Sequence, residues 1–178
     1  MKVKLNNVRI AFPDLFEPKS FNDSAPRYSA TFLFEPDSAT HEKLVQVMEQ
    51  VGEEKWKKEW AKVKKQLESQ DKTCLHDGGL KDYDGYEGNL FVSAGNKVRP
   101  TVIDTNKSPL AEADGKVYGG CYVNAVIDIW AQDNQYGKRI NASLKGVQFC
   151  RDGEPFGSSS GDCTDDFDEI DEDFDDLL

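Results

Sequence analysis

Large aromatic and basic side chains share one face of the stretch 118–149. Tyr122 and Trp130 occupy one parity of the first apolar run, and Arg139 and Lys145 occupy the polar parity of the run that follows. Residues two apart in a β-strand point to the same side, so these four side chains are expected on an exposed sheet face. Aromatic rings stack on nucleobases and cations neutralise phosphates, so this face predicts binding of single-stranded nucleic acid.

A second region adds to the predicted surface. Lys97, Arg99 and Thr101 share a parity, and Phe91 is expected on the same side as Arg99. Each base stacked on a ring contributes about 1–3 kcal/mol, so two or three stacks with several cations would suffice for binding. Packing inside the protein is the alternative for any single ring. The predicted DNA-binding residues are Phe91, Lys97, Arg99, Tyr122, Trp130, Arg139 and Lys145.

A β-hairpin is predicted to position the last four of these residues, Tyr122, Trp130, Arg139 and Lys145. Its strands run over 118–130 and 139–149, with a break at 131–138. The opposite parity is apolar and should face a core. Val126 is the one apolar residue on the polar parity of the first strand. The inward residues are Val123, Ala125, Ile127, Ile129, Ile140, Ala142 and Leu144.

Further strands are predicted before the hairpin. Alternation indicates strands over 2–12, 27–34, 89–95 and 97–104, joined by polar connections over 70–87 and 105–116. The first two strands should pair across the loop between them. Pro100 lacks an amide N–H, so the strand that contains it is expected at a sheet edge.

Residues 38–69 change to the period of a helix. Asp37 or Ser38 can cap its start, and a phase slip near Gly52 indicates a kink there. The apolar positions of the two halves are Leu44, Met48 and Val51, then Trp56, Trp60, Val63 and Leu67. The second half is rich in lysine, which has two interpretations. It is a solvated face of a helix that packs through its tryptophans, or a cationic flank for a polyanion.

This pattern predicts a mainly β fold with one inserted helix. An OB-fold-like antiparallel β-barrel of about five to six strands fits the order of elements, and a β-sandwich is the rival. The predicted domain covers residues 1–151, followed by a flexible linker over 152–161 that contains Gly-Ser-Ser-Ser-Gly, and an acidic disordered tail over 162–178.

Negative charge is concentrated in the tail. Ten of the 33 acidic residues lie in 162–178, which has no Lys or Arg, so 1–161 carries 23 acids against 22 bases. A near-neutral body with an anionic tail is compatible with a nucleic-acid partner. The large apolar residues of the tail, which we expect to contact partner proteins, are Phe167, Ile170, Phe174, Leu177 and Leu178.

Common catalytic signatures are absent from the sequence. It contains no G-x-x-x-x-G-K-[ST], G-x-S-x-G or H-E-x-x-H motif. Cys74 and His76 lack a second pair of ligands that would complete a zinc site, and His41 is expected at the surface. We therefore expect no enzymatic activity, no metal and no cofactor. The third hypothesis is a metal-dependent nuclease built on Asp82, Asp84 and Glu87, although acids in a glycine-rich loop are ordinarily turn formers.

The sequence contains no segment typical of a transmembrane helix or a signal peptide. It has no run of about 18 apolar residues, and its N-terminus alternates instead of forming the apolar core of a signal peptide. The four cysteines include no C-x-x-C pair, so free thiols are expected. We predict a cytoplasmic protein with no membrane partner.

Three features together resemble the phage-encoded single-stranded DNA-binding proteins of OB fold. They are Tyr-Gly-Gly-Cys-Tyr-Val-Asn-Ala at 118–125, Ile-Asn-Ala-Ser-Leu-Lys-Gly-Val-Gln-Phe at 140–149, and the acidic tail. The resemblance spans the chain from the Val-Arg-Ile-Ala-Phe strand at 8–12 onward. It implies a protein of phage DNA replication, recombination and repair that coats single strands in the host cytoplasm.

The resemblance also implies a role for the tail. Such tails compete with DNA for the binding groove and contact replication proteins, such as a polymerase, a primase or helicase, or a recombinase. Many end in an aromatic residue, whereas this chain ends Leu177-Leu178. The oligomeric state is open, with a homodimer as one option. The alternative function is a protein-interaction module or DNA-mimic inhibitor whose tail is the active part and whose body is a scaffold.

Overall fold

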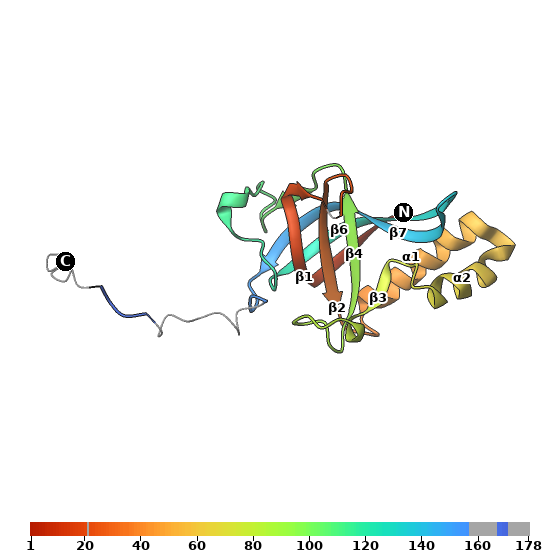
Figure 1. The fold of residues 1–178 in the computed structure, drawn as a ribbon, viewed down its shortest axis with the longest axis horizontal. Coiled ribbons are helices and arrows are strands. Elements are labelled where there is room, and N and C mark those ends of the chain that lie inside the picture. Colours follow the sequence, from red (N-terminus) through yellow and green to blue (C-terminus); the bar gives the residue numbers. More distant parts are fainter. Residues whose placement is uncertain (21, 157–166, 171–178) are drawn as a thin grey trace.

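The computed structural model describes residues 1–20, 22–156 and 167–170. The first two ranges form a β-barrel with an inserted helical segment (Figure 1). The α-helices of this part are α1 (Ala39–Trp56) and α2 (Trp60–Ser69). No helix among these residues is both long enough and apolar enough to cross a membrane. The strands of this part are β1 (Lys2–Lys19), β2 (Arg27–Phe34), β3 (Leu75–Asp77), β4 (Leu90–Asn96), β5 (Thr101–Ile103), β6 (Tyr122–Asn134) and β7 (Gly137–Arg151).

Five strands close into a barrel. Their order is β1-β2-β4-β7-β6, and β6 pairs back onto β1 in antiparallel fashion. The closing contact between β4 and β7 is parallel and joins Gly95 to Ser143. The short strands β3 and β5 lie at the edges, beside β4 and β7. The predicted OB-like barrel is therefore confirmed, and the β-sandwich alternative is wrong.

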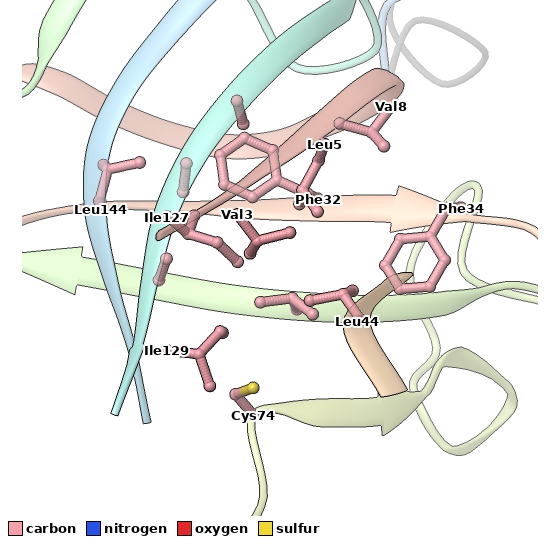
Figure 2. Packing of buried hydrophobic residues seen from close by; sticks show 14 of the residues in the cluster. Val3, Leu5, Val8, Phe32, Phe34, Leu44, Cys74, Ile127, Ile129 and Leu144 are labelled. Carbon is pink, nitrogen blue, oxygen red and sulfur yellow. The ribbon is translucent and has the colours of Figure 1, made fainter. Parts of the chain in front are cut away.

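Alternation along the strands builds the core. The four inward residues of β6 are at most 1 % exposed and lie on the predicted parity; they are Val123, Ala125, Ile127 and Ile129. Figure 2 shows Leu5 of β1, Phe32 of β2 and Leu144 of β7 in the same interior. Leu44 of α1 reaches this interior too, so the helix covers part of the barrel that no strand closes.

The helical segment is interrupted at a different residue from the one predicted. Ser38 caps α1, because its Oγ accepts a hydrogen bond from the His41 amide at 3.3 Å. The break between α1 and α2 lies at Lys57, whose φ is 49°. A kink at Gly52 was therefore wrong by five residues.

Gly52 serves packing instead of bending. A Cβ at this position would lie 2.5 Å from the Trp60 ring. The phase slip in the apolar pattern therefore marks the position at which the Trp60 ring of α2 packs against the backbone of α1. Trp56 and Trp60 stack at 5.7 Å between centroids and are both buried, as expected if the segment packs through its tryptophans.

The hairpin is longer than predicted. β6 and β7 continue through most of the expected break, and only Gln135 and Tyr136 separate them. Residues 130–141, here called the hairpin arm, lie next to the helices in Figure 1. Two hydrogen bonds hold the arm there: Trp56 Nε1 donates to Asp133 Oδ2 at 2.9 Å, and the Ile140 amide donates to the Lys72 carbonyl at 3.1 Å.

Other boundaries differ as well. β1 continues through Pro13 to Lys19, because register shifts after Ala11 and Asp14 let it stay paired with β2. In the region 97–104 only Thr101–Ile103 is strand, at the sheet edge that Pro100 indicated. The predicted loop over 70–87 contains the short strand β3.

The chain turns back against the barrel after β7. The Phe156 amide donates to the Gly119 carbonyl at 2.9 Å, and Arg9 Nη2 donates to the Glu154 carbonyl at 2.6 Å. The Arg9 guanidinium also lies 4.3 Å from the centre of the Phe156 ring. The domain, linker and tail boundaries stay predictions. Of the tail residues singled out above, Phe167 and Ile170 are exposed, while Phe174, Leu177 and Leu178 lie outside the described residues.

Candidate nucleic-acid interface

A groove crosses the outer faces of β2 and β4. It consists of two cavities of about 690 and 620 Å³. The two cavities share five lining residues, so they form one continuous depression, here called the β2–β4 groove; the shared residues are Asp14, Lys19, Ser29, His76 and Ser93. In OB folds the corresponding pair of strands, the second and third of the barrel, is the face that takes oligonucleotides.

One end of the groove is aromatic. Phe12 and Tyr83 are 57 % and 54 % exposed, and their rings meet edge to face with centroids 5.1 Å apart. Beneath them Tyr86 and Phe91 are buried, and each successive pair in the run from Tyr83 through Tyr86 and Phe91 to His76 is separated by 5.1 to 5.3 Å. The exposed pair therefore stands on a packed aromatic base.

Phe12 reaches this position through an unusual backbone. Its φ is 49°, in the left-handed region that bulky residues rarely occupy. It lies within the register shift between Ala11 and Asp14, where β1 bulges away from β2. Such a conformation costs on the order of 1–3 kcal/mol and persists only where the surroundings hold it. The bulge turns the ring outward, although its neighbour Ala11 is buried.

Trp130 occupies the other end of the groove. Its side chain is 41 % exposed, and its Nε1 donates to Ser143 Oγ at 2.9 Å. This bond fixes the ring against β7 while leaving one part uncovered. The opposite face of the arm is buried through Ile140, which belongs to the same core cluster as Trp56 and Trp60 of the helical segment.

Cations outnumber carboxylates along the groove. Among the described residues, its lining contains four cations, Lys19, Arg27, Lys81 and Arg139, and two carboxylates, Asp14 and Asp71. Asp14 lies 3.4 Å from Lys19, and Asp71 Oδ1 lies 2.8 Å from His76 Nδ1. The remaining cations leave the groove with a positive surplus suited to a polyanion.

The sequence-predicted residues do not all meet in this groove. Trp130, Arg139 and Phe91 line it, although Phe91 is 6 % exposed and lies beneath the outer rings. Lys145 lines a separate shallow cavity. Lys97 and Arg99 follow β4, where Arg99 lies 5.7 Å from the Phe16 ring.

Tyr122 lies in a different environment from Trp130. The Arg151 guanidinium is 3.8 Å from the centre of its ring, and that of Arg9 is 5.8 Å away. Trp130 follows Tyr122 by eight residue steps along the strand, which corresponds to roughly 27 Å. The shared parity of these two rings therefore does not put them in one site.

Sequence reasoning missed several groove residues. Phe12 and Tyr83 are the most exposed rings of the groove, and the missed basic residues are Lys19, Arg27, His76 and Lys81. Tyr83 and Lys81 belong to a loop whose composition predicts its irregularity but not the surface it covers. For Phe12, the interruption of alternation at Pro13 was the one available signal.

The cysteines and acids of the described residues do not form a reactive centre. No group of three or more His, Cys, Asp or Glu side chains there could hold a metal ion. Burial raises the pKa of the Cys74 thiol to about 12, and it also raises the pKa values of Cys121 and Cys150. These thiols are therefore protonated at neutral pH, and none of the three forms a disulfide.

Comparison with known proteins identifies the family. The family model described as the single-stranded DNA-binding protein of Enterobacter phage Enc34 matches residues 1–178. The chain belongs to this family. The resemblance to phage single-stranded DNA-binding proteins is thereby confirmed. Protein p50 of Acyrthosiphon pisum secondary endosymbiont phage 1 is 46 % identical over 175 residues, which cover 96 % of this chain and 94 % of that protein.

Solved structures agree with the membership in the Enc34 family. The single-stranded DNA-binding protein from bacteriophage Enc34, in complex with single-stranded DNA, is similar with a TM-score of 0.67 and 32 % identity, over 88 % of this chain and 89 % of that one. The single-stranded DNA-binding protein gp2.5 of bacteriophage T7 has a TM-score of 0.58 at 12 % identity, over 95 % and 98 % of the two chains. This second likeness shows a shared fold alone.

Proposed function

We propose that this chain binds single-stranded DNA along the β2–β4 groove and acts in phage DNA replication and recombination without being an enzyme. The observation that carries the proposal is one continuous groove with exposed rings at both ends and a surplus of cations between them. Membership in the Enc34 family supports it, since a member has been solved with single-stranded DNA. A DNA-mimic inhibitor with an inert body does not account for this groove.

The groove suggests a division of work among its residues. Trp130 stacks a base at one end, and Phe12 with Tyr83 stacks bases at the other. Arg27 and Arg139 neutralise phosphates between them. The floor near the closing strand is made of small side chains, Ser93, Ala94, Gly95, Ala142 and Ser143, which let a strand approach the sheet closely. Phe91 supports the rings from below, while Tyr122, Lys97 and Arg99 would have to meet DNA outside the groove.

Fluorescence anisotropy with labelled oligothymidine at several salt concentrations tests this proposal. Arg139→Gln should weaken binding and reduce the slope of log K against log salt by about 0.7, the value for one lost phosphate contact on a single strand. Lys62→Gln, at an exposed position of α2, is the control with the same charge change. An Arg139→Gln slope that equals the control slope would argue against the groove.

We further propose that the acidic tail competes with DNA and recruits replication proteins. After β7 the described chain reaches Phe156, which shares an apolar cavity of about 390 Å³ with Phe12 and Tyr83 at the aromatic end of the groove. Ten acids follow within 162–178, and they would meet the cations of the groove. The proposed protein contacts are Phe167, Ile170, Phe174, Leu177 and Leu178.

Truncation after Gly161 tests the competition. The truncated chain should bind single strands more tightly than the full chain, most clearly at low salt, where charge is least screened. A full-length variant with the ten tail acids changed to Asn or Gln should behave like the truncation. Unchanged or weaker binding by both variants would remove this part of the proposal, whereas the DNA-mimic alternative requires the isolated tail to reproduce the activity.

A further inference from the structure

A second group of cations lies outside the groove. Lys2 and Lys4 of β1 and Lys145 of β7 line a shallow cavity of about 410 Å³, here called the lysine pocket. All three side chains are exposed. The rest of the lining is uncharged and partly apolar: Thr101, Ile103, Asn124, Val126, Gly146, Val147 and Gln148.

The charges of the lysine pocket are available to a ligand. Among the described residues, none of its three lysines takes part in a salt bridge. Asp128 pairs with Lys2 in the strand register, but its Oδ1 accepts a hydrogen bond from the N-terminal ammonium of Met1 at 2.7 Å. Lys43 of α1 brings another ammonium next to β1, because its Nζ donates to the Lys4 carbonyl at 2.9 Å. Such a concentration of like charge favours a polyanion.

The lysine pocket continues from the groove along β7. Ser143 lines the β2–β4 groove and Lys145 lines the lysine pocket, so about 7 Å of strand connects the two. β7 is irregular here, because Ile127 pairs with Leu144 while Val126 pairs with Gly146, leaving Lys145 as the extra residue of a bulge. This bulge keeps Lys145 outward although the burial parity of β7 reverses beyond it.

The cation series also continues from β4. Gly95 bridges to Ser143 in the parallel direction. Lys97 lies two residues after Gly95, and Lys145 lies two residues after Ser143. The two lysines that the groove leaves unused therefore follow the point where the barrel closes.

We propose that the lysine pocket is a second contact region for the phosphates of the same single strand that occupies the groove. The DNA strand leaves the groove past Ser143 and crosses β7 at the bulge. It then runs over Lys145 toward Lys4 and Lys2. This inference rests on the proposed function and extends it. It makes the DNA-covered surface longer than the groove itself.

Oligothymidines of graded length test the proposal, from about 4 to 16 nucleotides, the range of site sizes known for OB folds, together with polythymidine. The full chain carrying Lys2→Gln, Lys4→Gln and Lys145→Gln should bind the shortest oligomers like the wild type. On the longest it should lose tenfold or more at low salt, and its salt slope should fall by about 2, as expected for three lost phosphate contacts. Lys145→Gln alone should give about a third of the slope change.

The matched control is the triple variant Lys58→Gln, Lys62→Gln and Lys65→Gln, which removes the same charge from exposed positions of the helical segment. It should not change the dependence of affinity on length. Equal losses on short and long oligomers, or equal losses in the control, would overturn the proposal, as would unchanged binding by the lysine-pocket variant. A different result would contradict the proposed function itself: affinity for the shortest oligomers that does not change when Trp130 or Arg139 is substituted.

Discussion

Tyr122 and Trp130 belong to the same strand and the same outward parity, yet they lie in different surroundings. Tyr122 is the first residue of β6, in the half of the strand that belongs to the barrel, and its ring contacts the guanidinium groups of Arg9 and Arg151. Trp130 begins the hairpin arm, where its ring lies over the groove and is tied to Ser143. Parity therefore fixes which way a ring points, while closure of the barrel decides what it meets.

The two halves of the hairpin also differ in support. In the barrel half, β6 is paired with β1 on one side and β7 on the other. The arm has only its own two strands and depends on Trp56 of α1 and on the Lys72 carbonyl just after α2. The inserted helical segment thus carries the part of the hairpin that bears Trp130 and Arg139.

Removing the support of the arm should produce the largest effect. Trp56→Ala deletes a buried ring and the hydrogen bond to Asp133, so the free energy of unfolding should fall by about 3–5 kcal/mol. Native-state hydrogen exchange should accelerate more at amides of 130–141 than at amides of 122–129. Val45→Ala, on an exposed position of α1, is the control. Uniform acceleration in both halves would show that the arm is not a separate unit.

Exchanging the two rings for alanine should separate their roles in binding. Trp130→Ala should weaken binding of single-stranded DNA by about 1–3 kcal/mol without loss of thermal stability, because it removes a base-stacking surface. Tyr122→Ala should leave the affinity nearly unchanged. Titration of both variants against one oligothymidine decides the matter, and equal weakening would mean that the shared face governs binding.

Tyr122 should instead affect stability. Its ring meets two guanidinium groups, each contact being worth about 0.5–1 kcal/mol when exposed. Tyr122→Ala should therefore lower the free energy of unfolding by about 1–2 kcal/mol, as measured by urea denaturation. Tyr136→Ala, which removes a ring that is 79 % exposed at the hairpin tip, should cost nothing measurable. Equal free energies of unfolding for Tyr122→Ala and Tyr136→Ala would contradict a structural role for the arginine contacts.

The smallest effect concerns how the helical segment is held together. Hydrogen bonds from Lys64 and Trp60 lower the pKa of Glu49 below its ordinary value. A lowered carboxyl pKa stabilises the fold at pH values above the unfolded pKa, and this stability is lost as pH falls through the folded pKa. Glu49→Gln should cost less than about 1 kcal/mol at neutral pH, because the pair is partly exposed. The difference from the wild type should vanish in acid during urea denaturation, and a difference that persists there would exclude the ionised pair.

Much of the fold could be predicted because it follows from local periodicity. The inward parity of β6, the strand over 27–34 and the cap at Ser38 depend on neighbouring residues alone. The hairpin was drawn too short because the arm is covered by helices distant in sequence. The β7 bulge at Lys145 and the bulges of β1 shift register through pairing with other strands, which a single run of letters does not reveal.

The groove was harder to predict than the barrel. Trp130 and Arg139 were found because they lie on a strand with clean alternation. Phe12 and Tyr83 were missed because one depends on a left-handed residue in a bulge and the other on where an irregular loop settles. Phe91 lines the groove but is buried, because the Tyr86 ring from that same loop and the His76 ring of β3 pack on it.

Phe156 is docked beside Phe12 and Tyr83. If the tail competes with DNA as proposed, this contact makes the acidic tail a ligand tethered at the aromatic end of the groove. A tethered segment meets a nearby site at an effective concentration that can reach the order of millimolar, independent of how dilute the protein is. Lengthening the chain between Phe156 and Asp162 would dilute the tail locally, roughly as the −3/2 power of length. Under the proposed competition, the anchor at Phe156 would therefore set the effective concentration of tail carboxylates at the groove.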